Sequence, residues 1–122
     1  MASRASPLLS ATPFTPRLSG GAFGFDFNPT VDRIRIVSDS GQDLRAHPDT
    51  GAVVPVDMPL RYAATDVRAG VDADVVAAAY TNPDTDPATG TALYDIDASP
   101  DALVIQAPPN DGTLRGLAVA LP

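Results

Sequence analysis

Apolar and polar residues alternate with period two in several short segments, and this pattern most constrains the fold of the chain. In AFGFDF, the three Phe fall on one face of an extended chain, and Gly24 and Asp26 fall on the other. In RIRIV, Ile34 and Ile36 share one face and the two Arg share the other. Successive side chains of a strand point to opposite faces, and aromatic and β-branched residues favour half-buried strands. The pattern therefore predicts β-strands.

The composition agrees with short strands that are joined by many turns. All 15 acidic residues are Asp and all 8 basic residues are Arg, so the chain lacks the good helix formers Glu and Lys. Asp favours turns and caps, and 13 Pro and 9 Gly add further chain breaks. Residues 63–79 are rich in Ala, but Gly70 and several Val argue against a helix there. We expect a buried strand over residues 75–81 instead.

Two groups of strands follow from these patterns. The first group of expected strands is 23–27, 33–37, 42–46 and 52–56. The second group of expected strands is 75–81, 92–97, 102–107 and 113–121. Turn segments such as DSGQ, HPDTG, ASPD and PPNDG separate the strands within each group. Pro55 makes the fourth strand an edge or irregular strand, because proline cannot donate a hydrogen bond to a neighbour.

The predicted organisation is a single all-β domain of two antiparallel four-stranded meanders. They span about 23–56 and 75–121, and residues 57–74 connect them. Residues 1–22 are expected to form a flexible N-terminal segment that leads into a strand near Ala22. The number of residues in each meander is typical of one propeller blade. The meanders are therefore predicted to be two blade-like sheets of a partial β-propeller.

Several sequence blocks resemble the bacterial DUF4394 family, a domain of unknown function. They are AFGFDFNPTVDRIRIVSDSGQDLR, PDTGAVV, VVAAAYTN, LYDID and PPNDGTL, in that order, and the resemblance covers roughly residues 12–122. It implies a propeller-type repeat fold in a family that is often exported and has no established activity. The family's domain normally extends further towards the N-terminus, so the chain resembles its C-terminal part. The resemblance therefore implies either self-association or missing N-terminal blades as partners.

The charge and composition exclude several classes of function. The net charge of −7 disfavours nucleic acids and anionic membranes, because phosphate binding needs clustered basic residues. No apolar run approaches the length of a membrane span, and no Cys is present for disulfides or thiolate sites. The start, MASRASPLLSATPF, has no continuous hydrophobic region and predicts no signal peptide. Localisation stays open.

Acidic residues near two turns are the candidate metal ligands. Asp95, Asp97 and Asp101 offer oxygen atoms that suit calcium, but Pro100 replaces the glycine that a calcium loop requires. We favour a solvated strand face over a metal site. The chain is therefore expected to bind no cofactor, and calcium is the alternative. The loop NPDTDPATG is a second acidic segment, which we interpret as ordinary Asp-Pro turn chemistry.

The region of residues 24–45 is dense in charge and forms a second candidate site. Its charged candidates are Asp26, Arg33, Arg35, Asp39, Asp43 and Arg45. We expect them to form exposed cross-strand ion pairs, with Leu44 inward and the flanking charges outward. The alternative is that Arg33 or Arg35 binds a carboxylate or phosphate ligand.

Little in the sequence favours catalysis. The only His is His47, in a Pro-Asp-Thr-Gly turn, and no nucleophile motif accompanies it. Tyr80 and Tyr94 are expected to be core or blade-packing residues and not a binding patch. The function stays unknown, and we favour a non-enzymatic binding or structural module of the propeller type. The alternatives are a metal-dependent propeller hydrolase or lyase, and a truncated remnant of a longer propeller without independent activity.

Overall fold

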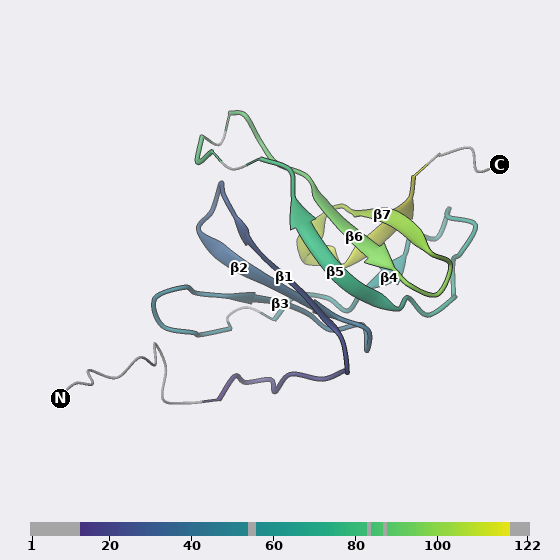
Figure 1. Cartoon of the computed structure of the whole chain (residues 1–122), viewed down its shortest axis with the longest axis horizontal. Coiled ribbons are helices and arrows are strands. Elements are labelled where there is room, and N and C mark those ends of the chain that lie inside the picture. Colours follow the sequence, from purple (N-terminus) through teal and green to yellow (C-terminus); the bar gives the residue numbers. More distant parts are fainter. Residues whose placement is uncertain (1–12, 54–55, 83, 87, 118–122) are drawn as a thin grey trace.

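A computed structural model describes residues 13–53, 56–82, 84–86 and 88–117 of the chain, and this part is all-β (Figure 1). Sheet 1 contains, in order, β1 (Phe23–Asn28), β2 (Arg33–Ser38) and β3 (Asp43–Ala46). Sheet 2 contains, in order, β4 (Arg61–Tyr62), β8 (Thr113–Gly116), β7 (Ala102–Gln106), β6 (Leu93–Asp97) and β5 (Val75–Tyr80). A short 3₁₀ helix, η1 (Pro109–Asp111), lies in the β7–β8 connection.

All neighbouring strands pair antiparallel except β4 and β8, which pair parallel. Strands β5 to β8 follow one another across sheet 2, so the second predicted meander is confirmed. In sheet 1, Ile36 pairs with Phe25 on one side and with Leu44 on the other. The alternation therefore aligns across the whole sheet, as the sequence pattern predicts.

The first meander differs from the expected four strands. Residues 52, 53 and 56 are not in a strand, and residues 54–55 lie outside the described part of the chain. The predicted connector instead contributes β4, which adds a fifth strand to sheet 2 beside β8. Residues 13–22 also form no strand, while residues 1–12 lie outside the described part. The Ala-rich segment contains β5 and no helix, as expected.

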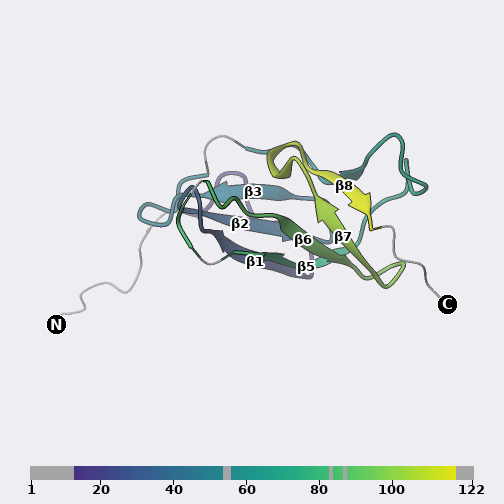
Figure 2. The same ribbon diagram turned by 90° about the horizontal axis from the view of Figure 1, so that it is seen from above.

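The two sheets are stacked as layers, and sheet 2 overlies sheet 1 when the molecule is seen from above (Figure 2). Strand β5 packs closely against β1, where the backbones approach at Gly24. A Cβ atom at this position would lie only 2.5 Å from backbone atoms of Ala77 and Ala78. The close contact therefore requires glycine. Nearby, the Tyr80 amide donates a hydrogen bond to Asp26 Oδ2 at 2.7 Å.

The apolar core has two parts, one on each side of sheet 1. Between the sheets lie the buried residues Val37, Leu60, Tyr62, Val75, Val104 and Leu114. On the outer face of sheet 1 lie the buried residues Ile36, Leu44, Ala46 and Val53, against which Phe14 and Ile34 pack. Sheet 1 is therefore lined with buried side chains on both faces, with the N-terminal segment passing along its outer side (Figure 1).

Within the described residues, no helix is long and apolar enough to cross a membrane.

Candidate functional site

The polar face of sheet 1 points inward, which reverses the sequence-based expectation. Asp43 and Arg45 were expected to point outward and Leu44 inward, yet Asp43 is only 2% exposed and Arg35 only 1% exposed. The register explains this, because Arg35 pairs with Arg45 across the sheet and lies on the face that meets sheet 2. Arg35 and Asp43 therefore belong to the interior, and the prediction of exposed ion pairs is wrong for these two residues.

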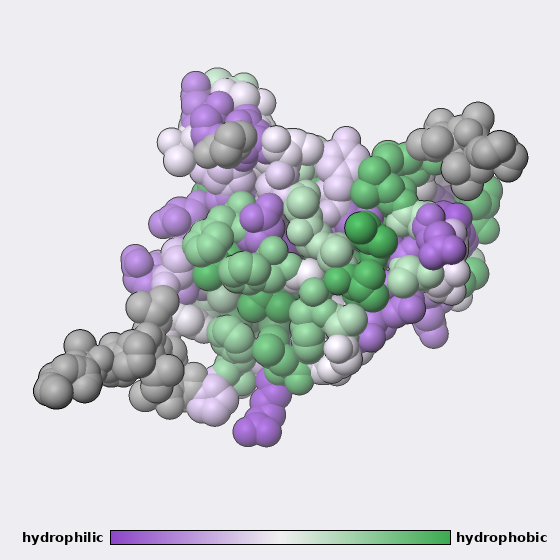
Figure 3. Space-filling view, viewed as in Figure 1, coloured by the Kyte–Doolittle hydropathy of each residue, from purple (hydrophilic) through white to green (hydrophobic). Residues whose placement is uncertain are grey.

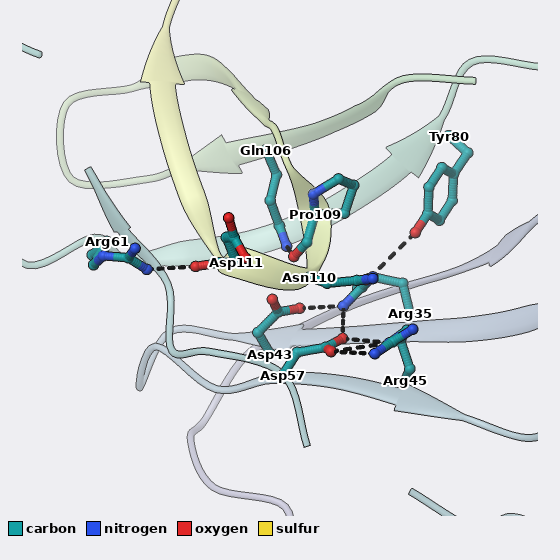
Figure 4. Close-up of polar contacts among 10 residues, drawn as sticks. All are labelled: Arg35, Asp43, Arg45, Asp57, Arg61, Tyr80, Gln106, Pro109, Asn110 and Asp111. Carbon is teal, nitrogen blue, oxygen red and sulfur yellow. Dashed lines mark hydrogen bonds and ion pairs between the residues drawn. The ribbon is translucent and has the colours of Figure 1, made fainter. Parts of the chain in front are cut away.

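Arg35 is the centre of a buried polar network (Figure 4). Its Nη1 donates to Asp43 Oδ1 at 2.7 Å and to Asp57 Oδ2 at 2.5 Å. Its Nη2 donates to Asn110 Oδ1 at 2.7 Å, and its Nε donates to the Tyr80 hydroxyl at 3.3 Å. All three guanidinium nitrogens are thus bonded to protein atoms. This geometry leaves little of Arg35 free for an anionic ligand.

Asp57 joins a second arginine to the network. Arg45 Nε donates to Asp57 Oδ2 at 2.8 Å, and Arg45 Nη2 lies 2.8 Å from Asp57 Oδ1. Asp57 comes from the segment that links the two groups of strands, and Asn110 comes from η1. The network therefore connects sheet 1 to both the linking segment and the β7–β8 connection. Breaking one partner would leave an uncompensated buried charge.

The other charged candidates of residues 24–45 lie outside the network. Arg33 Nη1 donates to the Asp32 carbonyl oxygen at 2.8 Å. Asp26 accepts from the Tyr80 amide, and Asp39 Oδ1 accepts from the Gly21 amide at 2.9 Å. Among the described residues, these three side chains form no ion pair. The structure thus separates one dense sequence segment into a buried network and local backbone contacts.

The interior also contains polar oxygen atoms without partners. Asp95 is 0% exposed, and both of its carboxylate oxygens lack a hydrogen-bond partner among the described residues. Asp43 Oδ2 and Gln106 Oε1 are buried and lack a partner as well. Burial raises the pKa of Asp43 to about 7, although Arg35 and Gln106 beside it act in the opposite direction. Burial and the charge of Asp43 raise the pKa of Asp95 to about 7.

The three metal candidates from the sequence do not converge. Asp97 Oδ2 accepts from the Tyr62 hydroxyl, and its Oδ1 accepts from the backbone amides of Asp74 at 3.0 Å and Ser99 at 3.2 Å. Asp101 is exposed in the β6–β7 turn. In the described part of the chain, no three His, Cys, Asp or Glu side chains are arranged to hold a metal. The expectation of a solvated strand face is also wrong, because Asp95 and Asp97 point into the interior while Ile96 is exposed.

The remaining candidates have local roles. In the acidic loop, Asp84 Oδ1 accepts from the Asp86 amide and Asp86 Oδ1 accepts from the Ala88 amide, each at 2.9 Å. These are the turn contacts that short Asp side chains make with the backbone. His47 Nδ1 accepts from the Asp49 amide at 3.1 Å within its own turn. Tyr94 is half-buried on the outer face of β6.

Sequence reasoning missed three polar residues that lie between the sheets, in the Arg35 network or beside it. Asp57, Gln106 and Asn110 come from segments that were assigned to a connector, an apolar strand and a turn. Gln106 alternates with Val104 on the inward face of β7, so its burial follows from the strand pattern. Nothing in the local sequence around Asp57 or Asn110 indicates a contact with Arg35, because these residues are 22 and 75 positions away from it.

The outer faces of both sheets expose large apolar side chains. On β1 these are Phe23, Phe25 and Phe27, and Phe25 is 59% exposed. On sheet 2, Ile96 and Leu103 are exposed and form a cross-strand pair. Figure 3 shows hydrophobic residues gathered across the middle of the face on which β1 and β5 lie in Figure 1. Contiguous exposed apolar patches are a common feature of interaction surfaces in proteins.

Comparison with known proteins agrees with the sequence blocks noted above. The model of a protein family, described as a domain of unknown function (DUF4394), matches residues 2–119. No curated protein and no solved structure matches the chain. The match covers nearly the whole sequence, and the chain therefore belongs to the DUF4394 family.

Proposed function

We propose that the chain is a non-enzymatic binding or structural module of the propeller type, which works through contacts between sheets. The observation that carries this proposal is the location of its polar and apolar groups. The charged side chains of the interior bind one another, whereas sheets 1 and 2 both present uncovered apolar side chains outward. Blade-like sheets normally bury both faces against neighbouring blades, which accounts for this distribution.

The partner that these faces fit best is a second copy of the chain. The outward positions of β1, β2 and β3 carry no charged residue, because the charges of these strands alternate onto the inner face. Two copies can therefore approach through this face despite the net charge of −7. Each copy exposes apolar side chains on opposite sides of the two-layer unit, with the Phe of β1 on one side and Ile96 and Leu103 on the other.

The arrangement we propose is head to tail. The outer face of sheet 2, with Ile96 and Leu103, covers the outer face of sheet 1 of the next copy, with Phe25 and Phe27. A symmetric pair formed through the Phe face alone would leave Ile96 and Leu103 exposed to water. Head-to-tail contacts cover both faces and close into a ring when the rotation between copies allows it.

Sedimentation velocity over a range of protein concentrations tests this proposal. The wild-type mass is expected to rise with concentration, and the double variants Phe25→Ser/Phe27→Ser and Ile96→Ser/Leu103→Ser should both stay monomeric. Val67→Ser is the matched control, because Val67 is 97% exposed and lies outside both sheets. Circular dichroism melts of each variant establish that its fold is intact.

Three results would overturn the proposal or one part of it. A wild-type protein that stays monomeric at every concentration would remove self-association as the use of these faces. Loss of association only in the Phe variant would replace the head-to-tail arrangement by a symmetric pair. Hydrolysis of a panel of lactone, ester and glycoside substrates, abolished by Asp95→Asn, would overturn the non-enzymatic assignment.

A further inference from the structure

We propose that a pocket between the inner face of sheet 1 and η1 binds the carboxylate group of a small organic acid. The pocket is lined by Asn28, Val31, Arg33, Arg45, Pro109 and Asn110. Of the two arginines that the sequence suggested for an anionic ligand, only Arg33 takes part. The inference is independent of the proposed self-association, because the lining contains none of Phe25, Phe27, Ile96 and Leu103.

The register of sheet 1 places three polar side chains of the pocket together on its inner face. Asn28 pairs with Arg33 where β1 and β2 meet at their turn. Arg45 pairs with Arg35, which lies two positions after Arg33 on β2. Paired residues, and residues two apart on a strand, point to the same face of a sheet. Asn110 reaches this face from η1, where its side chain contacts Arg35 (Figure 4).

The two side-chain amides of the pocket supply N–H groups. Asn28 Oδ1 accepts from the Thr30 amide at 3.0 Å and from the Thr30 hydroxyl at 2.9 Å. Asn110 Oδ1 accepts from Arg35 Nη2 at 2.7 Å. A backbone amide and a guanidinium can only donate, so these bonds fix which atom of each Asn is the oxygen. The Nδ2 atoms of Asn28 and Asn110 therefore stay free of the described residues and can donate to a ligand.

The two arginines of the pocket add charged donors. Arg33 Nη1 donates to the Asp32 carbonyl oxygen at 2.8 Å, and its Nε and Nη2 bond to none of the described residues. Arg45 binds Asp57 through Nε and Nη2, and its Nη1 bonds to no residue of the described chain. Nε and Nη2 form one edge of the guanidinium, which matches the two oxygens of a carboxylate. Arg33 thus keeps this edge for a bidentate contact, and Arg45 keeps one further donor.

The charges around the pocket favour an anion over a cation. Among the described residues, no acidic side chain lines the pocket. Asp57, which Arg45 binds, is buried and pairs with a second arginine as well. Asp26 lies on the same face of sheet 1, but it accepts from the Tyr80 amide and forms no ion pair in the described chain. Arg33 therefore brings a positive charge that no described carboxylate binds.

The charge and size of the pocket favour a monocarboxylate over a phosphate. One arginine edge lacks a partner and matches one negative charge, whereas a second negative charge would add to the repulsion from a chain of net charge −7. The pocket has a volume of about 310 Å³, at the lower end of the range for small-molecule sites. Val31 and Pro109 add apolar groups to its lining. We therefore expect an acid with a short apolar body.

NMR spectroscopy of the full chain tests this proposal with named probes. Proton–nitrogen correlation spectra are recorded while propionate, benzoate or cyclohexanecarboxylate is added. The neutral amides of these acids and inorganic phosphate are the comparison ligands. At least one carboxylate should shift the side-chain signals of Asn28, Arg33 and Asn110, with a dissociation constant of roughly 1 mM.

Substitutions then assign the binding to the pocket. Arg33→Met should weaken it about tenfold or more, because the charge and the planar edge are both lost. Arg33→Lys should weaken it as well, since an ammonium keeps the charge but lacks that edge. Arg115→Met is the matched control and should bind as the wild type does, because Arg115 is exposed on β8 and outside the pocket. Repeating the titration in the Ile96→Ser/Leu103→Ser variant separates binding from self-association.

The possible outcomes are distinct. Absence of localised shifts with all three carboxylates would overturn the proposal. Equal binding of the acids and their amides, or equal weakening in Arg33→Met and Arg115→Met, would also overturn it. Tighter binding of inorganic phosphate than of any carboxylate, weakened in Arg33→Met, would replace the organic acid by a phosphate ligand. If circular dichroism shows that Arg33→Met does not fold, Arg33→Lys provides the same comparison.

Discussion

The interior between the two sheets and the outer face of sheet 1 both differ from the same regions of an isolated sandwich, although the interior also holds an apolar core. The interior contains a buried arginine with two aspartates bonded to it, whereas the outer face exposes three Phe of β1. An isolated two-layer protein would place the Phe inside and the charges outside. The difference indicates that sheet 1 is built to be covered on both sides.

The reversal has a local cause at β1. Gly24 and Asp26 occupy the inward positions, where the β5 backbone approaches too closely for any side chain at Gly24. A Phe side chain has no room on this side of the strand. The Phe residues therefore occupy the outer positions, and Phe25 and Phe27 pack edge to face with ring centroids 5.9 Å apart. The buried charges of sheet 1 and its apolar outer face thus both follow from the register in which β1, β2 and β3 pair.

The largest expected effect comes from breaking the interior network at its centre. Arg35→Met removes the positive charge between Asp43 and Asp57 and leaves both carboxylates buried with less compensation. Breaking a buried ion pair from one side costs about 3–5 kcal/mol, so we expect this loss in the free energy of unfolding. Urea denaturation followed by circular dichroism measures it.

Arg33→Met is the matched control for this substitution. Arg33 lies two positions away on the same strand and forms no ion pair within the described residues. Its substitution should change the free energy of unfolding by less than about 0.5 kcal/mol. Equal effects of the two variants would contradict the assignment of a central role to Arg35.

The pH dependence of stability tests the burial of the carboxylates in the interior. Burial raises the pKa of Asp43 and Asp95 from 3.8 to about 7, so the folded protein holds protons that the unfolded chain releases. This contribution is complete below about pH 4 and is lost as the pH rises through about 7. In the absence of divalent cations, the melting temperature should fall over this interval.

In Asp95→Asn, the melting temperature should fall less between pH 4 and pH 7 than in the wild type, because the amide does not ionise. We expect the variant to exceed the wild type by about 5 °C or more at pH 8 and to differ less at pH 4. Melting curves of both proteins at the two pH values measure the difference. A wild-type protein that becomes more stable between pH 4 and pH 7 would contradict the raised pKa values.

A smaller effect is expected from adding one methyl group to the inner face of β1. Gly24→Ala places a Cβ atom 2.5 Å from the β5 backbone, and overpacking of this kind costs about 1–3 kcal/mol. The neighbouring substitution Phe25→Ala acts on the outer face of the same strand. It should cost at most about 1 kcal/mol in the monomer, although it removes a much larger group, because the ring is largely exposed.

Thermal or urea unfolding of both variants at low protein concentration gives the comparison. Low concentration matters because association through the Phe face would add stability to the wild type. If Phe25→Ala proved more destabilising than Gly24→Ala, the outer face would be packed within the monomer, and the contrast between the two faces would disappear.

The sequence alone determined the strands, their turns and the alternation of each strand. Seven of the eight strands of the described chain, all but β4, fall where alternation or a buried apolar run, bounded by Gly, Pro or Asp turns, places them. It also determined the family, through blocks spread over the whole chain. These properties are local, because they depend on the conformation and pairing of residues that are close in sequence.

Only the tertiary structure decided which face of each strand is buried. Alternation specifies two faces but does not say which one meets the other sheet. That choice depended on the contact between Gly24 and β5, and on Asp57 and Asn110, which reach Arg35 from distant segments. Buried charges are stable only with such partners, and partners far along the chain leave no periodic signal in the sequence.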